Sequence, residues 1–272
     1  MTEQSGAARI AAVFERARAE GRAAVMPYLT LGYPRPEASV ALVEAAAAGG
    51  ADLLEVGVPF SDPLADGPII QRATHVALQQ GTTAARCLEI VRGLRVRGLK
   101  VPLVLMGYYN PILAYGDAAF CRDCRQAGVD GLIVPDLPPE EGVTLEEACR
   151  RNGLALAYLL APTSPPARIH LVTERSEGFV YLVSVTGITG PRERLPAGLV
   201  QFVQRVRAVT DKPLAVGFGI ATPEQAGRVA ALADGVIVGS ALVRLSGEEK
   251  GPEKVAAFVA ELRQAVGGGQ ER

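Results

Sequence analysis

Short apolar runs rich in Val, Ile and Leu recur along the chain, and each is followed by a longer segment with the spacing of a helix. Near-continuous apolarity without strict alternation is typical of a parallel strand that is covered on both faces. The intervening segments, such as 37–49, 140–152 and 222–233, are rich in Ala and Arg and predict helices. Strands are predicted at 26–31, 52–58, 101–107, 129–135, 154–160, 178–184, 212–218 and 234–239.

Eight strands that alternate with helices predict an α/β fold, a single (β/α)8 TIM barrel over residues 1–272. A doubly wound open sheet is the alternative, but the number of strands and the chain length favour the barrel. The amphipathic segment 8–20 predicts an extra N-terminal helix before the first strand, placed to close the bottom of the barrel.

Two of the intervals between strands are longer than the others, those after the second and the sixth strand. The active site of such a barrel is built from the loops that follow its strands, so extra length there suggests function. We therefore expect extended functional loops at 59–80 and 185–198, although a helical turn at 67–80 would take up part of the first.

Composition excludes several classes of protein. The 28 Lys and Arg residues against 29 Asp and Glu give a formal net charge of −1. The chain therefore lacks the excess of basic residues that is expected of a protein that binds nucleic acid or a membrane surface. No segment has the pattern of a secretory signal or the ~20 apolar residues of a membrane span, so we expect a cytoplasmic protein. Cys121 and Cys124 form an isolated CxxC in a predicted helix, and a zinc or redox role is not expected.

Two carboxylates are the strongest candidates for chemistry. Glu55 lies inside the apolar run LLEVGV, where burial would raise its pKa and make it a proton donor near neutral pH. The alternative is a structural glutamate paired with an arginine. Asp66 follows in the proline-rich loop PFSDPLADGP, and Asp62 in the same loop could equally close a turn or cap a helix. Two carboxylates in different environments around one pocket are a recurrent acid–base arrangement.

The ends of the last three strands predict a lid and a phosphate site. The strand that holds Tyr181 is followed from residue 184 by SVTGITGPRERLP, in which Gly187 and Gly190 flank Thr189, as expected of a closing loop. Phosphate is often bound in such barrels by backbone N–H groups after strands seven and eight. The candidates for phosphate binding there are Gly217, Gly219, Gly239 and Ser240.

Several catalytic strategies find no support in the sequence. The lysines, Lys100, Lys212, Lys250 and Lys254, fall below the barrel or in the C-terminal tail, where none could form a Schiff base in the pocket. Both histidines fall in predicted helices, and we expect no metal site. The chemistry would therefore run on carboxylates, with Tyr28 and Tyr108 near strand ends to line an apolar pocket.

Seven blocks of sequence together resemble one family, the tryptophan synthase alpha chain. They run from about residue 27 to 243, and the block at 54–68 is the most specific, because other phosphate-binding barrels lack it. In chain order they are PYLTLGYP, LLEVGVPFSDPLADGP, MGYYNPI, VPDLPPEE, YLVSVTGITG, VGFGI and VGSALV. The resemblance implies retro-aldol cleavage of indole-3-glycerol phosphate to indole and glyceraldehyde 3-phosphate.

The resemblance also implies roles for individual residues. Glu55 matches the acid–base residue that protonates indole C3, and Asp66 matches the carboxylate that binds the indole N–H. Tyr181 matches a tyrosine near the glycerol chain. Thr189 and Gly190 match the lid that closes on Asp66. Gly219 and Ser240 match phosphate binders, and Gly190 is a further candidate for phosphate binding. Tyr28, Ile70 and Tyr108 match positions that line the pocket.

A partner follows from the same resemblance. The family passes indole to a beta chain that uses pyridoxal phosphate, within an alpha2beta2 tetramer, so no cofactor is expected in this chain. The loops that carry Asp62 and Gly187 resemble those that contact the beta chain. Two alternatives remain open on the sequence, namely another sugar-phosphate barrel enzyme or a non-catalytic alpha-like activator of a partner.

Overall fold

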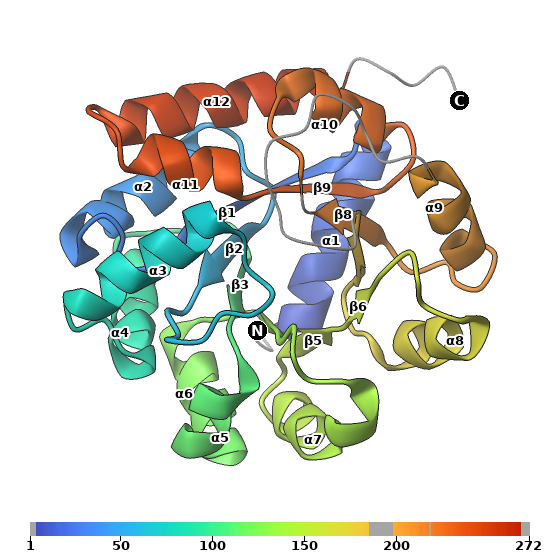
Figure 1. The fold of residues 1–272 in the computed structure, drawn as a ribbon, viewed down its shortest axis with the longest axis horizontal. Coiled ribbons are helices and arrows are strands. Elements are labelled where there is room, and N and C mark those ends of the chain that lie inside the picture. Colours follow the sequence, from blue (N-terminus) through green and yellow to red (C-terminus); the bar gives the residue numbers. More distant parts are fainter. Residues whose placement is uncertain (1–3, 185–197, 218, 268–272) are drawn as a thin grey trace.

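The computed structural model describes residues 4–184, 198–217 and 219–267. Its strands form one parallel sheet in the order β5-β4-β3-β2-β1-β9-β8-β7-β6, surrounded by helices (Figure 1). The strands are β1 Ala24–Thr30, β2 Leu54–Gly57, β3 Leu103–Met106, β4 Gly131–Ile133, β5 Ala155–Ala157, β6 Leu159–Leu160, β7 Val180–Val183, β8 Leu214–Gly217 and β9 Gly235–Val238.

The helices alternate with these strands, as the sequence predicts. In chain order they are α1 Gly6–Ala19, α2 Pro36–Ala48, α3 Pro68–Gln79, α4 Ala84–Val96, α5 Tyr109–Tyr115, α6 Asp117–Ala127, the 3-10 helix η1 Pro139–Glu141, α7 Val143–Arg151, α8 Pro166–Arg175, α9 Leu199–Arg207, α10 Pro223–Ala230, α11 Ser240–Ser246 and α12 Gly251–Ala265. The predicted loop 59–80 is irregular only as far as Gly67, because α3 begins at Pro68. Residues 185–197 of the other predicted loop lie outside the described residues.

The described residues form nine strands, one more than the predicted runs, because the run 154–160 is divided at Tyr158. Its first half, β5, pairs with β4, and its second half, β6, pairs with β7. At the division, the backbone N–H of Tyr158 donates to Ser176 Oγ, and its carbonyl accepts from Tyr181. The two ends of the sheet therefore meet in one continuous segment, which closes the barrel and confirms the predicted fold class.

The alternation of side chains along each strand decides which of them fill the barrel, because every second residue points inward. In β1, Met26 and Tyr28 point inward, whereas Val25 and Leu29 pack outward beneath the helices. Successive side chains of a strand point to opposite faces. Leu53 belongs to the inner cluster and Leu54 to the outer one, so the side chain of Glu55 points inward.

The N-terminal helix α1 closes the bottom of the barrel, as predicted for 8–20. Its buried side chains Ile10, Val13 and Phe14 join the inner cluster, and the rings of Phe14 and Phe179 lie 5.8 Å apart. In Figure 1, α1 crosses the centre of the ring. Gly6 is required where the helix begins, since a Cβ there would lie 1.9 Å from the carbonyl oxygen of Asp130.

Three aspartates tie the base of the barrel together. They lie one or two residues before β2, β4 and β9, and each accepts the backbone N–H of a residue at the start of the neighbouring strand. The pairs are Asp52 with Val25, Asp130 with Leu103 and Asp234 with Leu214. Each carboxylate is also paired with arginine side chains.

Two of these aspartates also hold α1. Arg9 lies 2.7 Å from Asp130, and Arg18 lies 3.6 Å from Asp234. Because β4 and β9 lie on opposite sides of the ring, α1 is attached at both ends across the base. The helix is therefore held by charge at its ends and by apolar packing along its middle.

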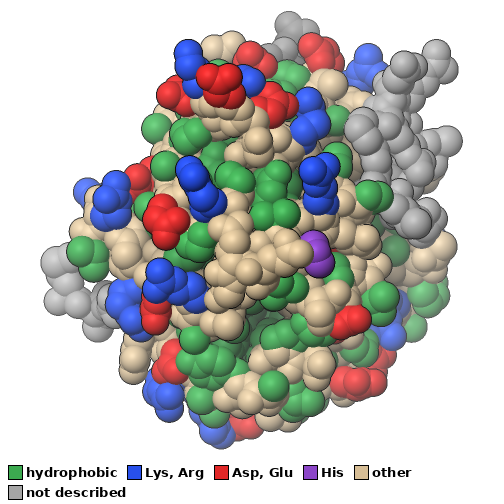
Figure 2. Space-filling view, turned by 60° about the vertical axis from the view of Figure 1, so that its left-hand side comes forward, with side chains coloured by type: hydrophobic (Ala, Val, Ile, Leu, Met, Phe, Trp, Pro, Cys, Tyr) green, Lys and Arg blue, Asp and Glu red, His purple; other side chains and the backbone are tan. Residues whose placement is uncertain are grey.

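The surface carries charges of both signs. On the face shown in Figure 2, Lys and Arg side chains alternate with Asp and Glu, in keeping with the net charge of −1. None of the described helices combines the length and apolar character that crossing a membrane requires.

We expect Asp130→Ala to lower the free energy of unfolding by about 3 kcal/mol, because the variant leaves two half-buried arginines without their shared carboxylate. Urea unfolding followed by circular dichroism measures this loss. The control is Glu89→Gln, which breaks the exposed pair with Arg86 and should change stability by no more than about 1 kcal/mol. Equal losses in the two variants would contradict the role given to Asp130.

Candidate active site

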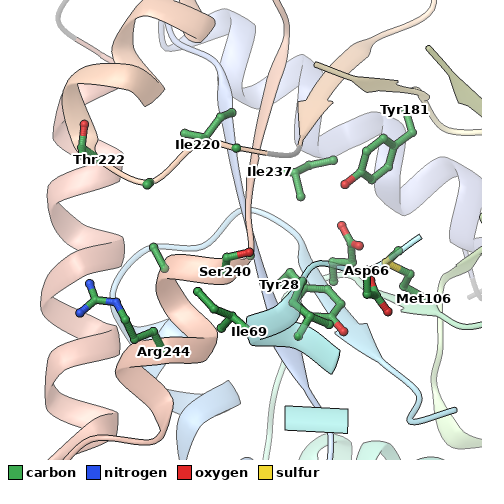
Figure 3. Close-up of a pocket in the computed structure, with 16 residues that line it drawn as sticks. Tyr28, Asp66, Ile69, Met106, Tyr181, Ile220, Thr222, Ile237, Ser240 and Arg244 are labelled. Carbon is green, nitrogen blue, oxygen red and sulfur yellow. The ribbon is translucent and has the colours of Figure 1, made fainter. Parts of the chain in front are cut away.

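A cavity of about 300 Å³ opens at the carboxyl ends of the strands (Figure 3). Most of the predicted site residues line this cavity. They come from β1, β2, β7, the loop before α3, α3 itself and the segments after β8 and β9. The predicted residues that line it are Tyr28, Glu55, Asp66, Ile70, Tyr181, Gly219, Gly239 and Ser240. The barrel thus brings residues from 28 to 240 around one space.

Glu55 is buried deep in this cavity, with 1% of its surface exposed. It pairs in register with Tyr28 of β1 and Val104 of β3, and its Oε2 atom has no hydrogen-bond partner among the described residues. Burial, and secondarily the nearby charge of Asp66, raises the pKa of Glu55 to about 8. The side chain is therefore protonated at neutral pH and can donate a proton into the cavity.

Asp66 reaches the same cavity from the loop between β2 and α3. Its Oδ2 atom accepts a hydrogen bond from the Tyr108 hydroxyl at 3.1 Å, and that hydroxyl accepts the backbone N–H of Ala65 at 2.9 Å. Burial raises the pKa of Asp66 to about 6, and the hydrogen bond from Tyr108 limits the rise. Asp66 is therefore mainly ionised at pH 7, where Glu55 is not.

Tyr108 was expected to line the pocket, but it acts from behind Asp66. It does not contribute to the wall of the main cavity, and its ring packs against Phe60 with centroids 5.3 Å apart. Its hydroxyl holds both the Asp66 carboxylate and the backbone of the adjoining loop. The residue therefore orients Asp66 toward the cavity.

Two glycines make room for the tyrosines of the site. A Cβ on Gly57 would lie 2.0 Å from the Tyr28 hydroxyl, and a Cβ on Gly217 would lie 2.4 Å from that of Tyr181. In each case a tyrosine leans over the glycine that ends the next strand. Gly217, which the sequence assigned to phosphate binding, is not part of the described cavity wall, and Gly57 was not singled out at all.

The remaining phosphate candidates lie together at the other end of the cavity. Gly219 has a φ of +80°, which favours glycine, and Gly239 precedes α11, whose first residue is Ser240. All three line the cavity with their backbone or side-chain atoms. Figure 3 places Ser240 between Tyr28 and the outer end of the site.

Asp62 lies outside the cavity. Its side chain is exposed and accepts a hydrogen bond from Ser61, and its carbonyl accepts the N–H of Leu64 at 2.9 Å. Leu64 is 92% exposed, so this part of the loop faces outward. The predicted lid and partner residues Gly187, Thr189 and Gly190 lie outside the described residues.

Sequence reasoning missed several residues of the cavity wall. Met106 and Ile237 occupy inward-pointing positions of their strands, and the alternation along the strand could have identified them from the sequence. Ile69, Ile220, Thr222 and Arg244 come from helices and loops, where no strand parity applies. Arg244 lies one helical turn beyond Ser240, and only that spacing could have pointed to it.

Other side chains that could in principle act in catalysis, such as lysine and cysteine, lie away from the site. Lys212 donates to the backbone carbonyls of Glu174 and Ser176, below the barrel. Cys121 and Cys149 are buried, with their sulfur atoms 3.7 Å apart. Over the described ranges no three His, Cys, Asp or Glu side chains are grouped as metal ligands would be.

These features define a class of protein: an enzyme on a (β/α)8 barrel that uses one protonated and one ionised carboxyl group for acid–base chemistry. The model of the tryptophan synthase alpha chain family matches residues 14–267. The chain therefore belongs to the tryptophan synthase alpha chain family.

Similar proteins agree with this assignment over nearly the full chain. The tryptophan synthase alpha chain of Chloroflexus aggregans is 49% identical over 258 residues, which cover 95% of this chain and 97% of that one. That of Geobacter sulfurreducens is 48% identical over 263 residues, with 95% and 99% covered. A structure of Mycobacterium tuberculosis tryptophan synthase is 42% identical, with a TM-score of 0.90 and with 98% and 100% covered.

The activity follows from the family. The reaction is the retro-aldol cleavage of indole-3-glycerol phosphate, as the resemblance implied, and an alpha chain of tryptophan synthase implies a beta-chain partner. Pyridoxal phosphate belongs to that beta chain. Of the alternatives left open by the sequence, family membership disfavours another sugar-phosphate enzyme, and the presence of both carboxyl groups disfavours a non-catalytic activator.

The raised pKa of Glu55 predicts a characteristic dependence of stability on pH. A carboxyl group with a pKa of 4.5 when unfolded and about 8 when folded binds more protons in the folded state between these values. Stability should therefore fall as pH rises from 4.5 to 8, by up to about 1.4 kcal/mol per pH unit from this group. In Glu55→Gln that contribution disappears.

Urea unfolding of the wild type and Glu55→Gln across this pH range measures the difference in slope. Glu89→Gln is the matched control, because it makes the same chemical change at an exposed carboxylate outside the cavity. Parallel curves for wild type and Glu55→Gln would show that Glu55 titrates normally in the folded protein.

Proposed function

We propose that Glu55 and Asp66 carry out the cleavage of indole-3-glycerol phosphate in this cavity. The observation that carries the proposal is the pair itself: two buried carboxyl groups in one cavity, with pKa values of about 8 and about 6. Between these values one group holds a proton that it can give, and the other holds a negative charge. The reaction needs both.

In the first step, the protonated Glu55 carboxyl donates its proton to C3 of the indole ring. The ring becomes positively charged, and Asp66 accepts a hydrogen bond from its N–H and stabilises that charge. The hydrogen bond from Tyr108 keeps the Asp66 carboxylate in place while this charge develops.

In the second step, the bond between C3 and the glycerol chain breaks, and its electrons return to the ring. The Glu55 carboxylate takes the proton of the hydroxyl on the departing carbon, which becomes an aldehyde. Glu55 gives one proton and regains one, so the enzyme ends as it began. Tyr181, on the inner face of β7, lies near enough to the cavity to position the glycerol chain.

The rest of the cavity suits the two ends of the substrate. The side chains of Tyr28, Ile70, Met106 and Ile237 form an apolar wall for the bicyclic ring. Gly219, Gly239 and Ser240 provide the backbone N–H groups and the hydroxyl that would bind the phosphate. Thr189 and Gly190 are proposed, from the resemblance alone, to close over Asp66.

Substitution of the two carboxylates tests these roles. Glu55→Gln should abolish indole release while glycerol 3-phosphate still binds, because the amide keeps the shape of the side chain but has no acidic proton to transfer. Asp66→Asn should slow release about 10²–10³-fold, as expected when a group that stabilises transition-state charge is removed. Glu89→Gln, with an exposed carboxylate, is the control. Turnover near that of the control in either variant would remove that residue from the mechanism.

We also propose that the chain acts in the cytoplasm, within an alpha2beta2 tetramer, and that it carries no cofactor of its own. The outward-facing part of the loop that carries Asp66 supports a contact with the beta chain, because Asp62 and the 92% exposed Leu64 lie there. Gly187 is the corresponding proposal for the second loop. A partner that contacts the loop at Asp62 could act on Asp66, four residues along the chain.

Indole release measured with and without a saturating beta chain tests the coupling. We expect slow release by the chain alone and a sharp rise with the partner, together with a complex whose mass fits two copies of each chain. Asp62→Asn should reduce the rise and leave the basal rate of the isolated chain unchanged. A rate that does not respond to the beta chain would contradict the coupling, and a mass for one copy of each would contradict the stoichiometry.

A further inference from the structure

We propose that Arg244 binds the phosphate group of the substrate and sets the preference of the site for phosphorylated ligands. The inference rests on the proposed placement of the phosphate beside Ser240. Arg244 was not a candidate on the sequence, and its role follows from its place in the cavity, the charges around it and the state of its ion pair.

The position of Arg244 matches the phosphate end of the cavity. It lies on α11 four residues after Ser240, so the two side chains share one face of the helix. Both line the cavity, and Figure 3 shows Arg244 and Thr222 at the outer end, with Asp66 and Tyr181 at the other. In this structure the Arg244 guanidinium points away from Ser240 and toward Glu248, one turn further along the helix. Long side chains on a helix readily lean toward its N-terminus, so a rotation about the side-chain bonds brings Arg244 toward Ser240.

The charges of the cavity call for a cation at that end. A phosphate monoester carries a charge of about −1.5 to −2 at pH 7, and the ionised Asp66 repels it within the same cavity. Arg244 is the one cationic side chain among the described residues that line the cavity. Its planar guanidinium group can give a phosphate two parallel hydrogen bonds.

The ion pair that Arg244 forms with Glu248 in this structure can break at little cost. Its Nη1 atom lies 3.3 Å from Glu248 Oε1, and 63% of the Arg244 side chain and 35% of that of Glu248 are exposed, so the pair is weak. Glu248 also has a second partner, Lys254, at 2.8 Å. When Arg244 turns to a phosphate, Glu248 therefore keeps a cation, and the exchange leaves no charge unpaired.

The test compares charge at position 244 with charge elsewhere on the surface. Calorimetry measures the Kd of glycerol 3-phosphate and of indole for the wild type, Arg244→Gln, Arg244→Lys and the control Arg228→Gln. Arg228 is an exposed arginine of α10 that does not line the cavity. Its substitution removes the same charge from the protein as a whole.

We expect Arg244→Gln to raise the Kd of glycerol 3-phosphate about tenfold, which is the loss of one charge-assisted contact. The KM for indole-3-glycerol phosphate should rise by a similar factor, while kcat changes much less, because the phosphate takes no part in bond breaking. Indole, which has no phosphate, should bind as before. Arg244→Lys should recover most of the affinity.

A Kd for glycerol 3-phosphate in Arg244→Gln that equals that of Arg228→Gln would overturn the inference. Equal weakening of indole and glycerol 3-phosphate would also overturn it, since that result indicates a change in cavity shape. The proposed mechanism is tested separately. If Glu55→Gln keeps its turnover while Arg244→Gln weakens only glycerol 3-phosphate, the mechanism is wrong and the inference about Arg244 stands.

Discussion

Burial of the Glu55 carboxyl group among apolar barrel side chains is the constraint on which the rest of the site depends. No arginine or lysine accompanies it within the described cavity wall apart from Arg244 at the far end, so the group is held neutral by its surroundings. Asp66 then has to be the charged member of the pair, and Tyr108 stabilises it in that state. One buried carboxyl group thus assigns the roles of its neighbours.

The two ends of the barrel are built for different purposes. At the base, Asp52, Asp130 and Asp234 each accept hydrogen bonds from a backbone N–H group and pair with arginine. At the mouth, Glu55 Oε2 and Asp66 Oδ1 have no hydrogen-bond partner among the described residues. Polar atoms without a hydrogen-bond partner at the mouth are available to a substrate.

Much of the fold could be predicted from the sequence, because apolar runs and glycine positions report directly on buried strands and helix ends. The inward position of Glu55 follows from strand parity alone. The division of the run 154–160 at Tyr158 could not be predicted, since it depends on hydrogen bonds with Ser176 and Tyr181 that only the closed barrel brings within reach.

The site was predictable where it lies on strands and less so elsewhere. Position 217 is a glycine because a side chain there would clash with Tyr181. From the sequence alone, such a glycine looks the same as one that lets a phosphate approach the backbone. Tyr108 contacts Asp66 from 42 positions away in the sequence, and composition and spacing gave no sign of that contact. Arg244 joins the cavity wall from the helical turn that follows Ser240, a place that only the spacing from Ser240 suggests.

The attachment of α1 across the base has a consequence for biosynthesis. Arg9 pairs with a residue 121 positions later, and Glu20, just beyond the helix, pairs with Arg263, 243 positions later. Within this chain α1 is synthesised before every strand, whereas residues that pack on its apolar side, such as Phe179 and Gly235, are made much later. The apolar contacts of Ile10, Val13 and Phe14 are therefore of long range in sequence and can be completed only late in synthesis, which is typical of a closed barrel.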